Sequence, residues 1–467
     1  MRPTAVVVLA AGRGVRMKSE QPKVLHEAAG IPLLGHVLAT AAHAAGGVPR
    51  SVIVVVGAGR ERVLAYLRDS APDAVAVLQD PPRGTGDAVK CAVPALEDAE
   101  IVIVLSGDVP LLTSGTLDTM LARFEEQEGT AVAFLTAHLA EPAAYGRVVR
   151  DATGAVTRIV ELKDASPNER EIREINAGVY AFDRAFLQES LPLLRDQNAA
   201  GEFYLTDLLG LGVAAGRPVI GVLVENPDEI RGVNSRLDLA HIEGLLLHAA
   251  TDRAMAAGAT LIRPETITLE SSVVFEPDTI VEPFVTMRGK THVGSGTCIG
   301  QGTVVKDAHF GKGVLVRPYC VIEGSRLEDG AVVGPFARLR EGTELAEGAH
   351  VGNFVETKKA RLGKGVKANH LTYLGDVTIG ERTNVGAGVI TCNYDGYAKH
   401  PTVIGSDVFV GSDVQLVAPV TVGNGAIIGA GTTVTKDVPA DALATSRAPQ
   451  KIYEAGGRKY HERKTKS

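Results

Sequence analysis

The stretch that decides the fold of the N-terminal half is Leu9 to Lys23, LAAGRGVRMKSEQPK, which directly follows the apolar run Ala5 to Val8. A buried strand that leads into a glycine-rich loop places backbone N–H groups where they can bind phosphate. Arg13, Arg16 and Lys23 add three cations around the glycines, more charge than a dinucleotide pyrophosphate needs. The loop therefore predicts a site for a nucleoside triphosphate at the end of the first strand.

Two common glycine-rich motifs fit this chain poorly. Gly12 and Gly14 match the first two glycines of a dinucleotide fingerprint, but Met17 stands where the third is required. The only GKT, at 289–291, has Phe284 where a P-loop needs its first glycine. A Rossmann dinucleotide site and a P-loop are both disfavoured.

The chain changes its pattern halfway. Up to about residue 230, short apolar runs alternate with helical stretches, which indicates an α/β domain built on a largely parallel sheet. From Leu237 to Ala257, apolar residues at helical spacing without proline predict one connecting helix, ended by Gly258. The predicted domains are therefore residues 1–236, the linker helix 237–257, and 258–467.

The C-terminal half has a period of six. Aliphatic residues recur at every sixth position in two series, Val333, Leu339, Leu345 and Val351, and Ile404, Val410, Leu416, Val422, Ile428 and Val434. Such a period predicts a parallel β-helix, in which each short strand forms one side of a coil. The segment 391–401, TCNYDGYAKHP, breaks the period and is expected to be a loop that leaves the coil.

Composition excludes several classes of protein. The formal net charge of −7 argues against nucleic-acid binding, which normally needs a basic face. The cysteines, Cys91, Cys298, Cys320 and Cys392, form no C-x-x-C pair, so neither a zinc site nor a disulfide framework is indicated. No window is apolar over the roughly 18 residues of a membrane span, and no secretory h-region opens the chain. We expect a cytoplasmic protein with small-molecule substrates.

The motifs carry a family resemblance. LAAGRGVRMKSEQPK resembles the L-A-A-G-x-G-x-R-M-(x)-P-K signature of sugar-nucleotide pyrophosphorylases. With the hexapeptide half, the chain resembles, over nearly its full length, the bacterial bifunctional N-acetylglucosamine-1-phosphate uridylyltransferases/glucosamine-1-phosphate N-acetyltransferases. This implies a Rossmann-like nucleotidyltransferase domain, a left-handed parallel β-helix and a homotrimer. The implied product is UDP-N-acetylglucosamine, a precursor for peptidoglycan and lipopolysaccharide-type cell envelopes.

The resemblance assigns residues of the first half to uridylyl transfer from UTP. Asp108, which ends the apolar strand IVIVLSGD, and Asn234 are implied ligands of Mg²⁺, with oxygen atoms of the kind that this ion prefers. Arg16 and Lys23 are implied to be catalytic cations. The implied contacts of UTP and UDP-N-acetylglucosamine are Leu9, Ala10, Ala11, Gly12, Lys23, Gln79, Gly84, Thr85, Ser106, Gly107, Asp108, Gly146, Glu161, Asn176 and Asn234. Ser106 departs from relatives that carry an aromatic residue there.

The resemblance likewise assigns acetyl transfer from acetyl-CoA to the second half. His370 is the implied general base, oriented by Glu356, because an attacking amine must lose a proton and histidine titrates near neutrality. The implied ligands of glucosamine 1-phosphate are Arg340, Lys358, Tyr373, Asn384 and Lys399. Those of acetyl-CoA are Ala387, Asn393, Tyr394, Ser412, Ala430 and Arg447.

Two alternatives stay open from the sequence. The β-helix could be only an assembly module behind a monofunctional nucleotidyltransferase, since solenoids are often structural. It could instead be a metal-dependent hydratase, which would require several histidines to converge between subunits. Loss of acetyl transfer on substitution of His370 separates the first from a bifunctional enzyme, and metal analysis exposes the second.

Overall fold

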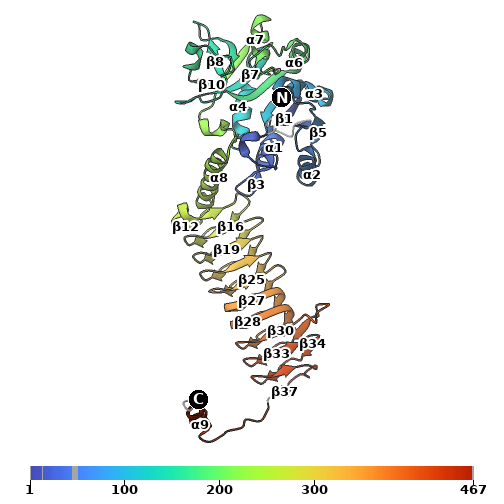
Figure 1. Cartoon of the computed structure of the whole chain (residues 1–467), viewed down its shortest axis with the longest axis vertical. Helices are drawn as coiled ribbons and strands as arrows, with labels where there is room; N and C mark the ends of the chain where they lie inside the picture. The colour runs from blue at the N-terminus through green and yellow to red at the C-terminus, as the bar shows by residue number, and fades with distance from the viewer. Residues whose placement is uncertain (1, 13, 45–50, 447, 465–467) are drawn as a thin grey trace. The chain divides into compact units, whose positions relative to one another are not determined.

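The computed structural model describes residues 2–12, 14–44, 51–446 and 448–464. The chain divides into two compact units, Met1–Leu246 and Leu247–Ser467. The first is an α/β unit and the second a coil of parallel strands (Figure 1). The predicted fold class is confirmed in both halves.

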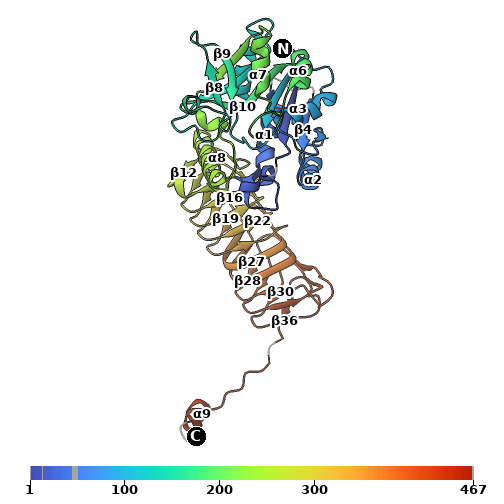
Figure 2. The ribbon, with the colours of Figure 1, turned by 45° about the horizontal axis from the view of Figure 1, so that its top comes forward.

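The first unit is built on a sheet with strand order β11-β7-β10-β6-β1-β4-β5. Its neighbours are parallel except β10, which runs antiparallel to both β6 and β7. A hairpin of β8 and β9 pairs with β10 beside the main order (Figure 2). The strands are β1 (Thr4–Ala10), β4 (Ser51–Val56), β5 (Val75–Leu78), β6 (Ile101–Ser106), β7 (Val132–His138), β8 (Arg147–Arg150), β9 (Val156–Val160), β10 (Glu174–Asp183) and β11 (Val219–Leu223), with a separate ribbon of β2 (Glu27–Ala28) and β3 (Ile31–Pro32).

Helices cover both faces of this sheet. Alternate residues of β1 enter opposite cores: Val6 and Val8 pack with Leu34 and Leu117, whereas Ala5 and Val7 pack on the other face. This explains why the central strand is apolar without interruption. The helices are α1 (Leu33–Ala42), α2 (Arg60–Ser70), α3 (Thr85–Ala92), α4 (Ser114–Glu125), α5 (Pro167–Arg170), α6 (Arg184–Ser190) and α7 (Asp207–Ala214).

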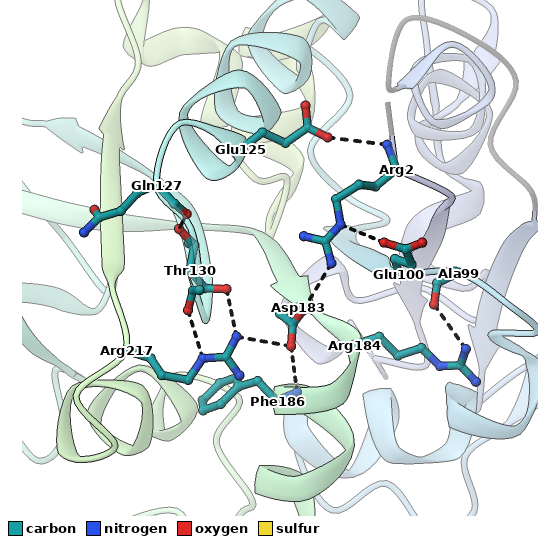
Figure 3. A network of polar contacts seen from close by, with 11 residues as sticks. Arg2, Ala99, Glu100, Glu125, Gln127, Thr130, Asp183, Arg184, Phe186 and Arg217 are labelled. Carbon is teal, nitrogen blue, oxygen red and sulfur yellow. Dashed lines mark hydrogen bonds and ion pairs between the residues drawn. The ribbon is translucent and has the colours of Figure 1, made fainter.

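Ion pairs hold the edge of the sheet where β1 and β6 begin (Figure 3). The Asp183 carboxylate accepts hydrogen bonds from the Phe186 N–H, at 3.0 Å, and from Arg2, and it pairs with Arg217 at 3.2 Å. Arg2 also contacts Glu100 at 2.9 Å. This network fixes the edge opposite to the one where β1 and β6 end, leaving that second edge for ligands.

The second unit is a parallel β-helix. Each strand pairs with a strand one coil later, so Ile280 faces Cys298, 18 residues further along the chain. The aliphatic positions of the six-residue period point inward: Val333, Leu339, Leu416 and Val422 are at most 1% exposed. The strands are β12 (Thr260–Leu261), β13 (Thr268–Leu269), β14 (Val274–Phe275), β15 (Ile280–Val281), β16 (Thr286–Arg288), β17 (His292–Val293), β18 (Cys298–Ile299), β19 (Val304–Lys306), β20 (His309–Phe310), β21 (Leu315–Val316), β22 (Val321–Glu323), β23 (Arg326–Leu327), β24 (Val332–Val333), β25 (Arg338–Leu339), β26 (Glu344–Leu345), β27 (His350–Leu362), β28 (Lys367–Ile379), β29 (Asn384–Val385), β30 (Ile390–Cys392), β31 (Thr402–Ile404), β32 (Phe409–Val410), β33 (Gln415–Val417), β34 (Val420–Val422), β35 (Ile427–Ile428), β36 (Thr433–Val434) and β37 (Leu443–Ala444).

A loop interrupts the coils between β30 and β31, as the broken period predicts. Across it, Thr378 faces Val403, 25 residues later instead of 18. The loop is closed by an antiparallel bridge between Tyr394 and Lys399. It therefore stands out from the coil without disturbing the strands on either side.

Two further helices follow the α/β sheet and the β-helix coils in the chain, respectively. Helix α8 (Arg236–Ala256) carries Ile242 in a cluster of the first unit and Ala250 and Ala254 in the core of the second. Helix α9 (Gly456–Lys464) lies near the C-terminus. Within the described residues, no helix is long and apolar enough to cross a membrane.

Candidate active sites

The glycine-rich loop folds tightly where β1 ends. It contains two short 3₁₀ turns, η1 (Val15–Met17) and η2 (Lys23–Leu25). Gly14 has φ of 60°, and a Cβ there would lie 2.6 Å from the Cβ of Lys23. Only glycine fits both the backbone angle and the close approach. The absence of a side chain at Gly14 thus leaves room for the Lys23 side chain.

Lys23 joins the two implied metal ligands. Its ammonium contacts the Asp108 carboxylate and donates to Asn234 Oδ1 at 3.2 Å. Arg16 donates to the same amide oxygen at 2.9 Å. The backbone brings the ligands together, since the Val233 N–H donates to the Asp108 carbonyl at 2.9 Å. Four of the residues predicted for this site therefore meet at one point.

The buried side chain of Met17 packs the glycine-rich loop against the rest of the first unit. Its side chain is 1% exposed and belongs to a small cluster with Leu33, Val233 and Ile242. Val233 precedes Asn234, so the same packing that holds the loop also holds the segment carrying the amide ligand. The residue that breaks the dinucleotide fingerprint therefore has a positive role, which sequence reasoning did not identify.

A further residue missed from sequence, Asp238, fixes the Asn234 segment. Its Oδ2 accepts hydrogen bonds from the N–H groups of Asn234, at 2.9 Å, and Ser235, at 2.8 Å. An aspartate in the first turn of a helix accepts such bonds routinely. Its position three residues after Ser235, at the start of the predicted helix, was the available signal.

A cleft of about 690 Å³ opens beside this point. It is lined by nine of the predicted nucleotide contacts: Leu9, Ala11, Gly12, Lys23, Gln79, Gly84, Thr85, Ser106 and Asp108. Ala10 is 2% exposed and can offer a ligand only backbone atoms. Gly107 packs on β1, its N–H donating to the Leu9 carbonyl at 2.9 Å.

Gln79 is almost fully buried at the wall of the cleft. Its Nε2 donates to the Gly84 carbonyl at 3.0 Å and to Asp87 at 2.8 Å. Both amide N–H groups are thereby used, which leaves the carbonyl oxygen to meet a ligand. Thr85 begins α3, and its Oγ1 accepts from the Leu205 N–H at 3.1 Å.

The predicted sugar contacts form a second group. The Asn176 N–H donates to the Gly146 carbonyl at 2.9 Å, and a Cβ on Gly146 would lie 3.4 Å from Glu161 Oε1. Burial raises the pKa of Glu161. The Asn176 amide is engaged locally, donating to Tyr180 at 2.6 Å and accepting from the Gly178 N–H at 3.1 Å. The second N–H of the Asn176 amide has no partner among the residues that the structure describes, so it can meet a ligand.

Cations gather on the β-helix. Arg340 and Lys358 line one cavity of about 500 Å³, and the Arg340 N–H donates to the Thr357 carbonyl on the next coil. Contact with Lys399, and then the charges of Lys399 and Arg340, lower the pKa of Lys358. Glu356 pairs with Arg340 at 3.0 Å. The carboxylates of Asp307, Glu323 and Glu341 also line this cavity. The closely spaced cations Arg340, Lys358 and Lys399 are nevertheless suited to bind a phosphate.

His370 has a different partner from the expected one. Its Nδ1 lies 3.0 Å from Asn353 Oδ1, while Glu356 pairs with Arg340. Asn353 and His370 are partners in the register of β27 and β28, one coil apart. The expectation that Glu356 orients His370 is therefore wrong within one chain. The missed signal was the spacing of 17 residues, which places one side chain above the other.

The implied coenzyme residues form a row. Asn384, Phe409 and Ile427 are in register on successive coils, so the residues three positions later, Ala387, Ser412 and Ala430, occupy equivalent places. The Asp413 N–H donates to the Ala387 carbonyl at 2.7 Å, and the Gly431 N–H to the Ser412 carbonyl at 2.9 Å. Arg447 lies outside the described residues.

The loop residues stand beside this row of strands. Asn393, 7% exposed, donates to Asp376 at 2.5 Å, and Tyr394 is exposed, its hydroxyl donating to the Gly396 carbonyl. A Cβ on Gly375 would lie 2.8 Å from the Asn393 amide nitrogen and would also meet the Tyr373 hydroxyl. Gly375 thus allows Tyr373 and Asn393 to come together.

Family comparisons agree with both units. Residues 6–171 match the MobA-like NTP transferase domain, and residues 401–436 match the bacterial transferase hexapeptide (six repeats). The fold and the two sites define a nucleotidyltransferase joined to a hexapeptide-repeat transferase.

Similar proteins identify the family. The chain is 47% identical over 451 residues to the bifunctional protein GlmU of Pelobacter propionicus, covering 96% of this chain and 97% of that protein. It is 48% identical over 455 residues to that of Heliobacterium modesticaldum, covering 97% and 98%, and 44% identical over 456 residues to that of Koribacter versatilis, covering 97% and 96%. The chain belongs to the bifunctional GlmU family. It is a uridylyltransferase and a glucosamine-1-phosphate acetyltransferase, and it makes UDP-N-acetylglucosamine.

Proposed function

We propose that uridylyl transfer takes place in the cleft where β1 and β6 end. The observation that carries this assignment is the meeting of Lys23, Asp108 and Asn234 beside the glycine-rich loop. Gln79 offers its carbonyl oxygen to an N–H of the base, and Gly84 and Thr85 lie alongside. The acceptor, N-acetylglucosamine 1-phosphate, is placed near Gly146, Glu161 and Asn176.

The residues present fit Mg²⁺. The Asp108 and Asn234 oxygens both face one cationic atom, the Lys23 ammonium, so a single ion can contact both. Within the described residues, no group of three or more His, Cys, Asp or Glu could hold a metal. Two protein ligands are typical of Mg²⁺ that is completed by phosphate oxygens and water. When bound, the ion neutralises phosphate charge in the transition state.

The chain's own residues supply position and positive charge. The glycine-rich loop binds phosphate oxygens through backbone N–H groups, and Arg16 and Lys23 stabilise the charge that collects as pyrophosphate departs. A phosphate oxygen of the sugar phosphate attacks the α-phosphorus of UTP, and the bond to the β-phosphate oxygen breaks. No covalent enzyme intermediate is required.

Acetyl transfer is assigned to the β-helix, with His370 as the general base. When His370 Nδ1–H donates to Asn353 Oδ1, Nε2 carries the lone pair that accepts a proton from the attacking amine. The amine attacks the thioester carbonyl of acetyl-CoA, and coenzyme A leaves as the thiol. The backbone N–H of Ala387 stabilises the tetrahedral oxyanion.

Arg340, Lys358 and Lys399 bind the phosphate of glucosamine 1-phosphate, and Tyr373 and Asn384 complete the sugar site. The mutual repulsion of these cations, which lowers the pKa of Lys358, supports an anionic ligand. Asn393, Tyr394, Ser412, Ala430 and Arg447 are assigned to the coenzyme.

We also propose a homotrimer assembled through the β-helix. Tyr319, Phe336 and Phe354 form an aromatic ridge on successive coils, with ring centroids 5.5 and 5.6 Å apart. Each is about half exposed and has φ near 60°, a costly angle for a bulky residue. The ridge ends at Phe354, next to Asn353, which contacts His370. A second copy packed there would join the site, and the described part of one chain shows no hydrogen bond between His370 and the phosphate cations.

The proposed setting is the cytoplasm of a bacterium, where the product supplies cell-envelope synthesis. Free cysteines at Cys91, Cys298, Cys320 and Cys392 are in keeping with a reducing compartment.

Substitution of His370 tests the assignment. His370→Ala should lower acetyl transfer by about 10²- to 10⁴-fold, the usual contribution of a general base, and leave uridylyl transfer to pre-acetylated substrate unchanged. His248→Ala, on an exposed face of α8, is the matched control. If both activities survive in His370→Ala, another group is the base.

A further inference from the structure

Lys23 occupies an unusual position among the charges of the first unit. Its ammonium contacts Asp108 and Asn234, the two oxygens assigned to Mg²⁺. Lysine in a phosphate loop is expected to point toward phosphates. Here the same side chain instead lies between the metal ligands.

The contact between Lys23 and Asp108 is largely shielded from solvent. The side chains of Lys23 and Asp108 are only 16% and 15% exposed, so water screens the pair weakly. A divalent cation bound by the same two oxygens would lie against the ammonium, and like charges at that distance repel strongly. Lys23 and a metal ion therefore compete for Asp108 and Asn234.

The Lys23 side chain can also adopt a second position, toward the nucleotide cleft. It lines the cleft together with Gly12 and Gln79, and its flexible four-carbon stem can turn about its Cβ. Phosphates bound at Gly12 would offer the ammonium a new partner. Arg16 donates to the same Asn234 oxygen, so it too turns to the phosphates before a metal ion binds there.

We propose that Lys23 is an internal counter-ion that occupies the metal-ligand oxygens of Asp108 and Asn234 until nucleotide phosphates draw it away. The divalent cation then enters with the nucleotide, not before it. Asp108 never stands as an unpaired, partly buried carboxylate, and the nucleotide-free enzyme has little affinity for metal. This inference rests on the proposed uridylyl-transfer site and adds an order of binding.

The test is Mn²⁺ binding to the full-length, nucleotide-free protein, measured by electron paramagnetic resonance. Lys23→Met keeps the length of the side chain and removes its charge, so the variant should bind Mn²⁺ at least about tenfold more tightly than the wild type. Lys18→Met, which removes an exposed lysine of the same loop, should bind as the wild type does. Adding Asp108→Asn to Lys23→Met should abolish the gain. Equal Mn²⁺ affinities for Lys23→Met and Lys18→Met would overturn the proposal.

A second measurement needs no variant and so does not depend on Lys23→Met folding. The rate of lysine acetylation by a chemical reagent, followed peptide by peptide by mass spectrometry, should rise at Lys23 when Mn²⁺ saturates the nucleotide-free protein. The rate at Lys18 should stay constant. If the acetylation rate of Lys23 does not change when Mn²⁺ is added, the proposed competition between Lys23 and the metal ion is contradicted.

Variants of Asp108 distinguish failure of the proposed metal site from failure of the counter-ion role of Lys23. If Asp108→Asn binds Mn²⁺ in the presence of UTP as well as the wild type does, the metal assignment itself is wrong. If Asp108→Asn loses that binding while Lys23→Met shows no gain, only the counter-ion role is overturned.

Discussion

Three cations, Arg340, Lys358 and Lys399, are assigned to one phosphate on the β-helix, with Glu356 as the carboxylate that pairs with Arg340. Contact with Lys399 is the largest cause that lowers the pKa of Lys358. A lysine with a lowered pKa loses its proton at lower pH than an isolated lysine, and an uncharged amine binds phosphate poorly. Affinity for glucosamine 1-phosphate should therefore fall early as the pH rises.

Lys399→Met should raise the pKa of Lys358, because it removes the largest cause that lowers it. The alkaline fall of kcat/KM for acetyl transfer should then move to higher pH, even though kcat/KM near neutrality decreases, because one phosphate ligand is gone. The measurement is a pH profile of kcat/KM, which reports the free enzyme. Lys359→Met is the control, since Lys359 is the smallest of the causes. An alkaline limb that stays in place in Lys399→Met contradicts this account.

At the same scale, Asn353 and Lys23 differ in how far sequence could foresee their roles. Asn353 precedes His370 by one coil, so the period of the repeat contained the information. Lys23 and Asn234 are 211 positions apart, and their contact depends on how β1, the glycine-rich loop and the segment before α8 pack. The resemblance named these residues, but only the fold shows that they touch.

At the scale of elements, the glycine-rich loop and the start of α8 share one small apolar cluster. Met17 packs with Val233 and Ile242, so the loop carrying Lys23 and the segment carrying Asn234 are held by the same contacts. Truncation of Met17 would loosen both at once.

Met17→Ala should cost about 2 to 5 kcal/mol of stability, the usual range for a buried methionine, and should also lower uridylyl transfer in the protein that remains folded. Met120→Ala, fully buried on α4 in another core of the same unit, should cost similar stability without that added loss. Thermal unfolding and kcat/KM for each variant give the comparison. If Met17→Ala loses no more activity than Met120→Ala, the cluster does not position the site.

The elements themselves were largely predictable. Uninterrupted apolar strands indicated a covered parallel sheet, and the six-residue period indicated the β-helix, because both patterns follow directly from which side chains are buried. The antiparallel β10 was not foreseen, since its direction depends on pairing with β6 and β7 rather than on its own sequence.

At the scale of the whole molecule, assembly is the first question. The aromatic ridge leaves three rings half exposed at strained backbone angles, which a second copy could cover. Phe336→Glu should weaken self-association by roughly thirtyfold, equivalent to about 2 kcal/mol, because a charge would replace a central contact. Phe409→Glu, an equally exposed ring outside the ridge, should leave association unchanged. Sedimentation velocity measures the self-association of each variant. If the Phe336→Glu protein associates like the wild type, the aromatic ridge is not the contact between copies.

The central claim is that one chain performs both transfers, each at its own site. The most direct measurement is a mass-spectrometric time course with glucosamine 1-phosphate, acetyl-CoA, UTP and Mg²⁺, omitting one component at a time. We predict that N-acetylglucosamine 1-phosphate forms without UTP and that UDP-N-acetylglucosamine appears only when all four are present. If only pre-acetylated sugar phosphate is converted, the β-helix is a scaffold and the assignment of His370 is wrong.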